Sequence, residues 1–498
     1  MATSVAGRTA IGAGWMVAWR MVSRALGMVS TLVLARLLVP ADFGLIAMAT
    51  AFTGAVSYLS AMGVTDALIR RPDTGEEWFD TAFGFQAYRG LLNGVIILAG
   101  TGATVQWFDE PRLGPILYVL AATAVLAGFE NVGIVQYRRD IQFSIEFRLL
   151  IIPRLLQFVG ILGMAFIIAD YRAMLFGGVL YAIARFIMSY RLHPWRPDLR
   201  MAFRVQHWRN LLSFSAWTWV AGLGSLVWER CDPFVLGPAL GTSQIGRYLL
   251  AAEIATLPLT EIVAPAMAAL FAGISAARAQ GTNVAAIAPT LILALLTVLA
   301  PISIGLSATS GYLVTGLLGP QWQDVRPMIA TFAWVGVLSP IAFTCNTVLT
   351  SQGLVRRGFY AIAGSAAMRL MLMTALVHAG MTEYAPAMVV VATAAEALLF
   401  LSQIPLRGDP AWRAHLFGLS RLIAAGLVTA GAFHVSGLAW QPVALGPVQA
   451  LLAGGALGLA GIALFLATQF GLWRLVGAPD GAELHVITMM QAGRKSLA

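Results

Sequence analysis

Two arginines interrupt the first long apolar stretch of the chain at a spacing of one helical turn. Arg20 and Arg24 share a helix face that continues through Gly27 and Thr31, whereas the opposite face is apolar. A guanidinium donates two parallel charge-assisted hydrogen bonds to a phosphate and stays charged when it is partly desolvated. The pair is therefore a candidate site for a diphosphate, and structural pairing with acidic residues of another helix is the alternative.

A second polar face lies in the third apolar stretch. Gln86, Arg89 and Asn93 follow one another at intervals of three and four residues, which places them on one side of a helix. A polar face within an apolar stretch suggests that it lines a cavity. We expect these three side chains to contact the same ligand.

The seventh apolar stretch carries three charged residues close together. Glu229 and Asp232 lie on one stripe, with Arg230 beside them. Arg230 is a candidate ligand contact, and the two acids are candidate gate residues that pair with the arginines of the first stretch. Alternatively, the three charges neutralise one another.

Two carboxylates in the next stretch are candidates for coupling to an ion. Glu253 and Glu261 flank Thr256 and Thr260. Burial raises the pKa of a carboxyl group, so that it can exchange a proton near neutral pH. We expect these residues to bind a coupling proton or cation.

The composition identifies the medium that must surround these polar residues. The chain has 498 residues, of which 59% are hydrophobic and only 11% charged, whereas a soluble domain carries about a quarter charged residues. A bilayer core about 30 Å thick is crossed by roughly 20 apolar residues in a helix, and each backbone amide there must bond within its own segment. The sequence predicts an all-α polytopic membrane protein.

Apolar runs bounded by charges, Gly and Pro predict about 14 transmembrane helices. Their ranges are 12–38, 43–66, 81–106, 112–136, 146–169, 172–191, 209–240, 244–272, 284–307, 327–350, 357–379, 384–405, 417–438 and 446–470.

Loop charges predict the orientation of these spans. When loops are numbered alternately, most loop arginines and the single lysine fall on one side, which the positive-inside rule makes cytoplasmic. The other side has only Arg36, Arg112, Arg172, Arg247 and Arg326. We expect both termini in the cytoplasm. Arg154, Arg185 and Glu130 then lie within reach of the cytoplasmic surface, and we expect them to extend toward it.

An internal repeat predicts two lobes. VLARLLVPADFG, from Val33 to Gly44, and VLGPALGTSQIG, from Val235 to Gly246, share Val, Leu and Gly at a constant offset. Six spans separate the copies, so both have the same orientation and a pseudo-twofold axis along the membrane normal relates them. We expect six-helix lobes at 1–191 and 209–405, a basic cytoplasmic linker at 192–208, and two added helices with a tail at 406–498. Parallel repeats of this kind are typical of transporters.

The remaining chemistry-bearing residues form no catalytic or metal-binding pattern. Cys231 and Cys345 lie within apolar stretches, and the six histidines are scattered. The basic residues serve membrane orientation, so nucleic acid is not an expected partner. We predict no enzyme activity, no cofactor and no metal. A membrane polysaccharide polymerase or glycosyltransferase is the enzyme alternative, but the longest predicted outside loop offers only Asp324 and Arg326 as candidate groups.

Several segments resemble one known family in the same order along the chain. They are LVLARLLVPADFGLIAMAT followed by GVTDALIRR, then 107–117, 135–143, 229–248, 256–259 and 317–322. Over roughly residues 8 to 405 the chain resembles Wzx-type polysaccharide flippases, most closely the colanic-acid-exporter branch of the MOP superfamily. It departs from the family pattern at Glu253, where a basic residue is more common.

The resemblance implies a flippase without ATP hydrolysis. Its cargo would be an undecaprenyl-diphosphate-linked oligosaccharide, moved from the cytoplasmic to the periplasmic leaflet for export of exopolysaccharide, capsule or O-antigen. Other expected partners are membrane lipids and the polymerase and export machinery of the same pathway. A cation-coupled multidrug exporter of the same superfamily is the alternative, although drug cations favour acidic or aromatic walls and the first span supplies two arginines without an acid.

Overall fold

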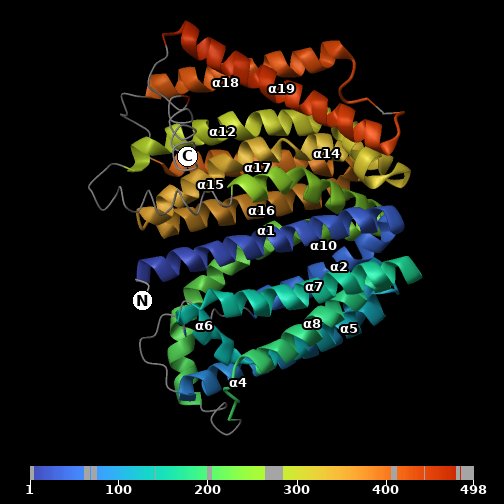
Figure 1. Ribbon diagram of the computed structural model, residues 1–498, viewed down its shortest axis with the longest axis vertical. Helices are drawn as coiled ribbons and strands as arrows, with labels where there is room; N and C mark the ends of the chain where they lie inside the picture. The colour runs from blue at the N-terminus through green and yellow to red at the C-terminus, as the bar shows by residue number, and fades with distance from the viewer. Residues whose placement is uncertain are drawn as a thin grey trace. The chain divides into compact units, whose positions relative to one another are not determined.

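The computed structural model describes most of the chain as helices (Figure 1). The described residues are 5–60, 68, 76–140, 142–198, 205–263, 284–404, 412–441, 444–477 and 483. Contacts divide the chain into two compact units, Met1–Gly246 and Arg247–Ala498. The division falls after Gly246, so the predicted seventh span, 209–240, belongs to the first unit by its contacts. The predicted lobe boundary at 192–208 stays a prediction.

The first unit is built from long helices and short connections. Its elements are α1 (Val5–Leu37), α2 (Pro40–Leu59), α4 (Glu76–Phe108), α5 (Leu113–Gly128), η1 (Val132–Ile134), α6 (Val135–Arg139), α7 (Phe143–Ile168), α8 (Arg172–Leu192) and the part of α10 (Val205–Pro258) that ends at Gly246. The closest packing joins α7 to α8, α4 to α5 and α1 to α7.

The second unit continues from α10 into further helices. They are η2 (Leu259–Val263), α12 (Val284–Ala308), α13 (Ser310–Leu313), η3 (Val314–Leu318), η4 (Pro320–Val325), α14 (Arg326–Phe332), α15 (Val335–Ser351), α16 (Val355–Ala379), η5 (Thr382–Tyr384), α17 (Ala385–Gln403), α18 (Trp412–Ser436) and α19 (Pro447–Leu475). Its main hydrophobic core joins α12, α15, α18 and α19, so the two added C-terminal helices pack on the second unit.

The predicted spans fall on these helices. Ten helices of the described residues are long and apolar enough to cross a membrane, and two bent pairs raise this number to 12. The predicted spans 209–240 and 244–272 both fall on α10, which is interrupted at Gly241 by a φ of 70° and a ψ of 174°. The chain is a multi-pass membrane protein.

A pair of glycines fixes α4 against α5. A Cβ at Gly90 would lie 2.5 Å from the Cα of Gly128, and one at Gly128 would lie 2.7 Å from the Cα of Gly90. The backbones therefore approach more closely than any larger residue allows, as is common where membrane helices pack.

Arg185 and Glu130 form an ion pair inside the first unit instead of extending separately toward the cytoplasm as we predicted. Arg185 Nε lies 2.8 Å from Glu130 Oε2, and Arg185 Nη1 donates to the Tyr181 hydroxyl at 3.1 Å. The side chains are 29% and 12% exposed. Glu130 follows the end of α5 at Gly128 and lies against Arg185 of α8, so the two charges neutralise each other within the protein.

We expect each single substitution of this pair, Arg185→Gln or Glu130→Gln, to lower the free energy of unfolding by about 3 kcal/mol, because it leaves one buried charge unpaired. The double substitution should cost less than the sum of the two. Thermal or denaturant unfolding of the purified proteins measures the difference. Additive effects would show that the two groups are independent.

The beginning of the predicted linker folds back onto the first unit. The Asn131 side chain donates to the Trp195 carbonyl at 2.9 Å, and the Asp198 amide donates to Asp80 Oδ1 at 2.8 Å. The Trp195 ring packs against Phe79 and Phe83. Burial lowers the pKa of the neighbouring His193. Residues 199–204 lie outside the described residues.

A twofold contact joins the two copies of the repeat at their predicted extracytoplasmic ends. A Cβ at Gly44 would lie 1.8 Å from the Thr242 carbonyl oxygen, and one at Gly246 would lie 2.0 Å from the Pro40 carbonyl oxygen. The repeat offset pairs Pro40 with Thr242 and Gly44 with Gly246, so each contact is the image of the other. Such reciprocity is the property of an interface on a twofold axis.

Glu483, in the segment that follows α19, forms hydrogen bonds with both of the last two helices. Arg421 of α18 donates to Glu483 Oε1 through Nε at 3.0 Å and Nη2 at 2.8 Å, and Gln469 of α19 donates to the same oxygen at 2.9 Å. All three side chains are buried. At the opposite end, the Trp440 amide donates to the Ala308 carbonyl, and the indole donates to Ser307 Oγ.

Candidate functional site

The polar stripe predicted on the first span lies on α1. Arg20 is exposed and Arg24 is half-buried, whereas Gly12, Trp15 and Leu34 face α7 or its neighbours. In the most apolar segment of α1, only 6% of the residues are buried within the protein. The helix therefore packs along one side and leaves the edge of its arginine stripe accessible.

Arg154 of α7 reaches this stripe, which the sequence did not lead us to expect. Its Nη2 lies 3.0 Å from the position that a Cβ at Gly27 would occupy, and its Nη1 donates to Gln157 Oε1 at 2.7 Å. Gly27 is one turn beyond Arg24 on α1.

The direction of the Arg154 side chain contradicts our prediction that it extends toward the cytoplasmic surface. The Trp15 and Phe147 rings pack at 4.9 Å, which places these two residues at the same level of α1 and α7. At about 1.5 Å per residue in both helices, Gly27 is then level with about Val159. The guanidinium of Arg154 therefore lies roughly 7 Å further from the predicted cytoplasmic end than its own Cα.

The three polar residues of α4 do not share one lining face. Arg89 is half-buried and lines a cavity of about 170 Å³ with Val56, Phe85 and Leu92 among its walls. Gln86 instead donates to the Ala127 and Glu130 carbonyls at the end of α5, and Asn93 is buried. The side chains diverge because this part of α4 borders both α5 and the cavity. Of the three, only Arg89 lines this cavity.

Arg230 of α10 lies against α2. A Cβ at Gly54 would lie 3.0 Å from its Nε and 3.1 Å from its Cζ, and this buried Nε has no hydrogen-bond acceptor among the described residues. Asp232 is buried and accepts a hydrogen bond from the Cys231 thiol. The side chain of Glu229 lies outside the described residues, so the predicted gate pairing with Arg20 and Arg24 stays a prediction.

Glu253 and Glu261 are exposed side chains, contrary to the burial that we expected. Glu261 lies in the wide turn η2 and accepts a hydrogen bond from Thr260 at 3.2 Å, while Thr256 bonds to the carbonyl of Ala252 one turn back. In a predicted membrane span, exposure at the protein surface does not by itself mean exposure to water. The role of these residues in ion coupling stays a prediction.

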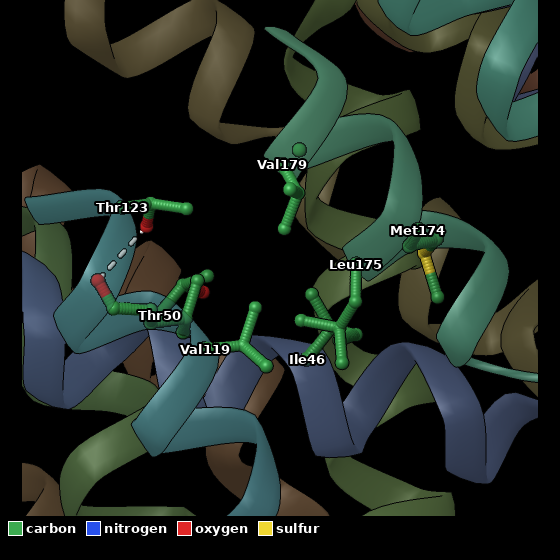
Figure 2. A pocket seen from close by; sticks show the side chains of 9 residues that line it. Ile46, Thr50, Val119, Thr123, Met174, Leu175 and Val179 are labelled. Atoms are coloured by element: carbon green, nitrogen blue, oxygen red, sulfur yellow. Dashed lines mark hydrogen bonds between the residues drawn. The ribbon is translucent and has the colours of Figure 1, made fainter. Parts of the chain in front are cut away.

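A second cavity of about 170 Å³ lies between α2, α5 and α8 (Figure 2). Ile46, Val119, Met174 and Leu175 contribute apolar walls, and the two threonine hydroxyls there bond to carbonyls of their own helices. No charged residue is among the described residues that line it. This cavity is suited to hydrocarbon and cannot hold a phosphate group.

Four of the helices in the first unit carry an arginine within a predicted span. Helices α1, α4, α7 and α10 of the first unit each contribute an arginine, namely Arg24, Arg89, Arg154 and Arg230. Among the residues that the structure describes, no group of three or more His, Cys, Asp or Glu could hold a metal ion.

A family model with the description "Polysaccharide biosynthesis protein" matches residues 33–327, which is more than half of the chain. The chain belongs to this family. The match contains α2 through α13 and therefore most of the arginines of the candidate site, whereas Arg20 and Arg24 precede it.

Curated relatives of this polysaccharide biosynthesis protein come from three bacteria. Teichuronic acid biosynthesis protein TuaB of Bacillus subtilis is 24% identical over 60% of this chain and 62% of its own length. Lipopolysaccharide biosynthesis protein WzxC of Escherichia coli is 20% identical over 71% and 72%. Succinoglycan biosynthesis transport protein ExoT of Rhizobium meliloti is 25% identical over 68% and 67%. The match thus spans less than two thirds of the length of TuaB.

Solved structures identify the fold. The lipid II flippase MurJ in an inward closed conformation aligns with a TM-score of 0.72 at 12% identity, over 92% of this chain and 99% of MurJ. An inward-facing multidrug resistance MATE family transporter of the MOP superfamily aligns at 0.56 with 16% identity, over 77% and 94%. This family member therefore shares its fold with these two membrane proteins.

Proposed function

We propose that this protein is a flippase for a polyprenyl-diphosphate-linked oligosaccharide. The carrier would be undecaprenyl diphosphate, and transport would run from the cytoplasmic to the periplasmic leaflet of the bacterial inner membrane by alternating access of the two repeats. Both termini would be cytoplasmic. The product would supply export of an exopolysaccharide, capsule or O-antigen, together with the polymerase and export machinery of that pathway.

The observation that carries this proposal is the set of arginines within the first unit. Placing an arginine at mid-bilayer costs about 2.5–3.5 kcal/mol on the insertion scale, so several such residues need a wet cavity, a partner or an anionic ligand. Arg230 and Arg154 hold their guanidiniums over glycines of neighbouring helices, where a larger residue would crowd them. A lipid carrier with a diphosphate headgroup supplies the complementary charge.

A strain that lacks the gene tests the proposal. We expect lipid-linked oligosaccharide to accumulate on the cytoplasmic face of the membrane and polymer export to fall, because the intermediate cannot cross. Measurement combines extraction of labelled lipid-linked intermediates with quantification of exported polymer. Restoration by the wild-type chain is the control. Unchanged intermediates and unchanged export would refute the flippase function.

A cation-coupled multidrug exporter is the second candidate, and the fold similarity to a MATE family transporter favours considering it. The same deletion strain discriminates between the two. A drug exporter predicts greater sensitivity to cationic drugs with normal polymer export. The arginines favour the lipid diphosphate, because they repel a cationic drug.

A further inference from the structure

We propose that Trp107 is a positioning residue for the predicted extracytoplasmic end of α10, because its indole supplies a hydrogen bond that Pro238 cannot make. The residues concerned are Trp107 and Phe108 at the end of α4 and Phe234, Gly237 and Pro238 on α10, and we call them the α4–α10 contact. This inference rests on the proposed function and adds to it a residue that acts on transport through the position of α10.

Pro238 leaves a carbonyl of α10 without its usual helical donor. In an α-helix each carbonyl accepts a hydrogen bond from the amide four residues further on. The residue four positions after Phe234 is Pro238, which has no amide hydrogen. Phe234 lies within the predicted span 209–240, where lipid offers no donor in its place. A donor from another helix therefore stabilises this part of α10.

Trp107 of α4 is that donor. Its indole Nε1 donates to the Phe234 carbonyl oxygen at 3.1 Å, and its ring stacks on the Phe234 ring with centroids 5.8 Å apart and planes at 22°. A tryptophan at the end of a membrane helix commonly directs its N–H to the wet side of the lipid–water interface. The N–H of Trp107 instead meets the carbonyl that lacks its donor because of Pro238, which indicates a role in holding α10.

The neighbouring Phe108 brings the two helices close together. Its ring meets the Phe234 ring edge-on with centroids 5.9 Å apart. A Cβ at Gly237 would lie 2.6 Å from Phe108 Cε1, and Phe108 is buried. The Phe234 ring is thus packed against two aromatic rings of α4, and the missing side chain at Gly237 lets the backbone of α10 approach them.

The end of α4 is built to hold these two aromatic residues in place. Asp109 has a left-handed backbone with a φ of 49°, and the Glu110 amide donates to the Val105 carbonyl at 3.2 Å. This hydrogen bond over five residues is typical of the Schellman motif, which ends a helix at a defined residue. The two aromatic side chains therefore belong to the last turn of a capped helix.

The α4–α10 contact lies directly before the break in α10. Gly241, three residues after Pro238, interrupts the helix, and Thr242 and Gly246 beyond it meet the backbone of α2. Because α4 holds α10 just before the break, it fixes the point from which the segment 242–246 begins. Loss of the indole hydrogen bond should therefore let this segment move away from α2.

Labelling of a reporter cysteine in the full-length protein tests the proposal. The background carries Thr242→Cys, with Cys231 and Cys345 replaced by serine, and the probe is a membrane-impermeant maleimide. Trp107→Phe keeps an aromatic ring but removes the donor, so it should raise the labelling rate about threefold or more. Pro238→Ala restores an amide hydrogen at the position that normally serves the Phe234 carbonyl. In that background Trp107→Phe should leave the rate nearly unchanged.

The ratio of labelling rates with and without Trp107→Phe decides the question. Equal ratios in the Pro238 and Pro238→Ala backgrounds would overturn the proposal, whether both are raised or both are close to one. Trp440→Phe is the matched control, because Trp440 also donates its indole N–H, to Ser307 Oγ at 3.2 Å in the second unit. It should leave the labelling rate unchanged in both backgrounds.

Protein levels in the membrane replace the labelling rate if Trp107→Phe does not accumulate. Pro238→Ala should then restore the level, because the backbone amide takes over from the indole. A protein that is lost equally in both backgrounds would contradict the proposal.

Polymer export connects this inference with the proposed function and separates the two. Trp107→Phe should lower export about threefold, and Pro238→Ala should restore it. Normal export despite faster labelling would overturn the role of Trp107 in transport. If the deletion strain accumulates lipid-linked oligosaccharide but Trp107→Phe acts equally in both backgrounds, the flippase function stands and this inference is wrong. If the effect depends on Pro238 but the deletion changes neither intermediates nor export, Trp107 positions α10 and the proposed function is wrong.

Discussion

Arg24→Ala should reduce polymer export at least tenfold while the protein remains in the membrane at its normal level. Arg24 lies near the middle of α1, one turn from the glycine over which Arg154 is held. Removing its guanidinium removes a charge-assisted contact to the cargo, and such a contact typically contributes about 1.5–3 kcal/mol. Complementation of the deletion strain, with immunodetection of the protein, measures the effect.

Two further variants show whether the loss of export depends on the guanidinium of Arg24. Arg24→Lys should keep part of the export, since the charge remains but the planar fork is lost. Arg36→Ala is the matched control, because Arg36 is an exposed arginine in the last turn of the same helix, far from the stripe. Normal export by a stably expressed Arg24→Ala protein would remove Arg24 from the cargo contacts.

Gly44→Val and Gly246→Val should each reduce export about tenfold or more, for a different reason. At these positions a Cβ would lie 1.8 Å and 2.0 Å from backbone carbonyl oxygens, so the backbones of α2 and α10 must move apart. Backbone atoms cannot yield as a flexible side chain can. The extracytoplasmic ends of the two repeats could then no longer close on one another, and alternating access requires that closure.

A single reporter cysteine measures this separation. With Cys231 and Cys345 replaced by serine, Thr242→Cys should react with a membrane-impermeant maleimide several times faster when Gly44→Val is also present. Gly102→Val is the control, because a Cβ there would meet nothing within 4 Å. Full export and unchanged labelling in Gly44→Val would mean that this contact has no part in transport.

The sequence led to the fold because each span must satisfy its own backbone in lipid. Apolar runs of sufficient length are therefore helices whatever their neighbours are. The offset between Val33–Gly44 and Val235–Gly246 predicted a repeat, and the structure adds that the two segments touch, with Gly44 against Thr242 and Gly246 against Pro40. The predicted spans 209–240 and 244–272 also anticipated the break in α10, which the structure places at Gly241.

Side-chain directions were harder to predict than helices. Gln86 and Asn93 share a helical arc with Arg89, but the arc straddles the boundary between α5 and a cavity, and the period of the helix does not locate that boundary. Arg154 was assigned to the surface by its distance from the helix end. Its direction depends on Gly27 of another helix, and only the packing of α1 on α7 reveals this.

The tail contact of Glu483 has a consequence for the biogenesis of the protein. Arg421 is buried beside Glu483 and Gln469, yet both of these residues follow it in the chain. During synthesis, α18 must therefore enter the bilayer while its arginine still lacks the carboxylate that will neutralise it. Only after α19 has inserted and the tail has emerged from the ribosome can the ion pair form. A protein truncated after α19 would leave the buried Arg421 without this carboxylate.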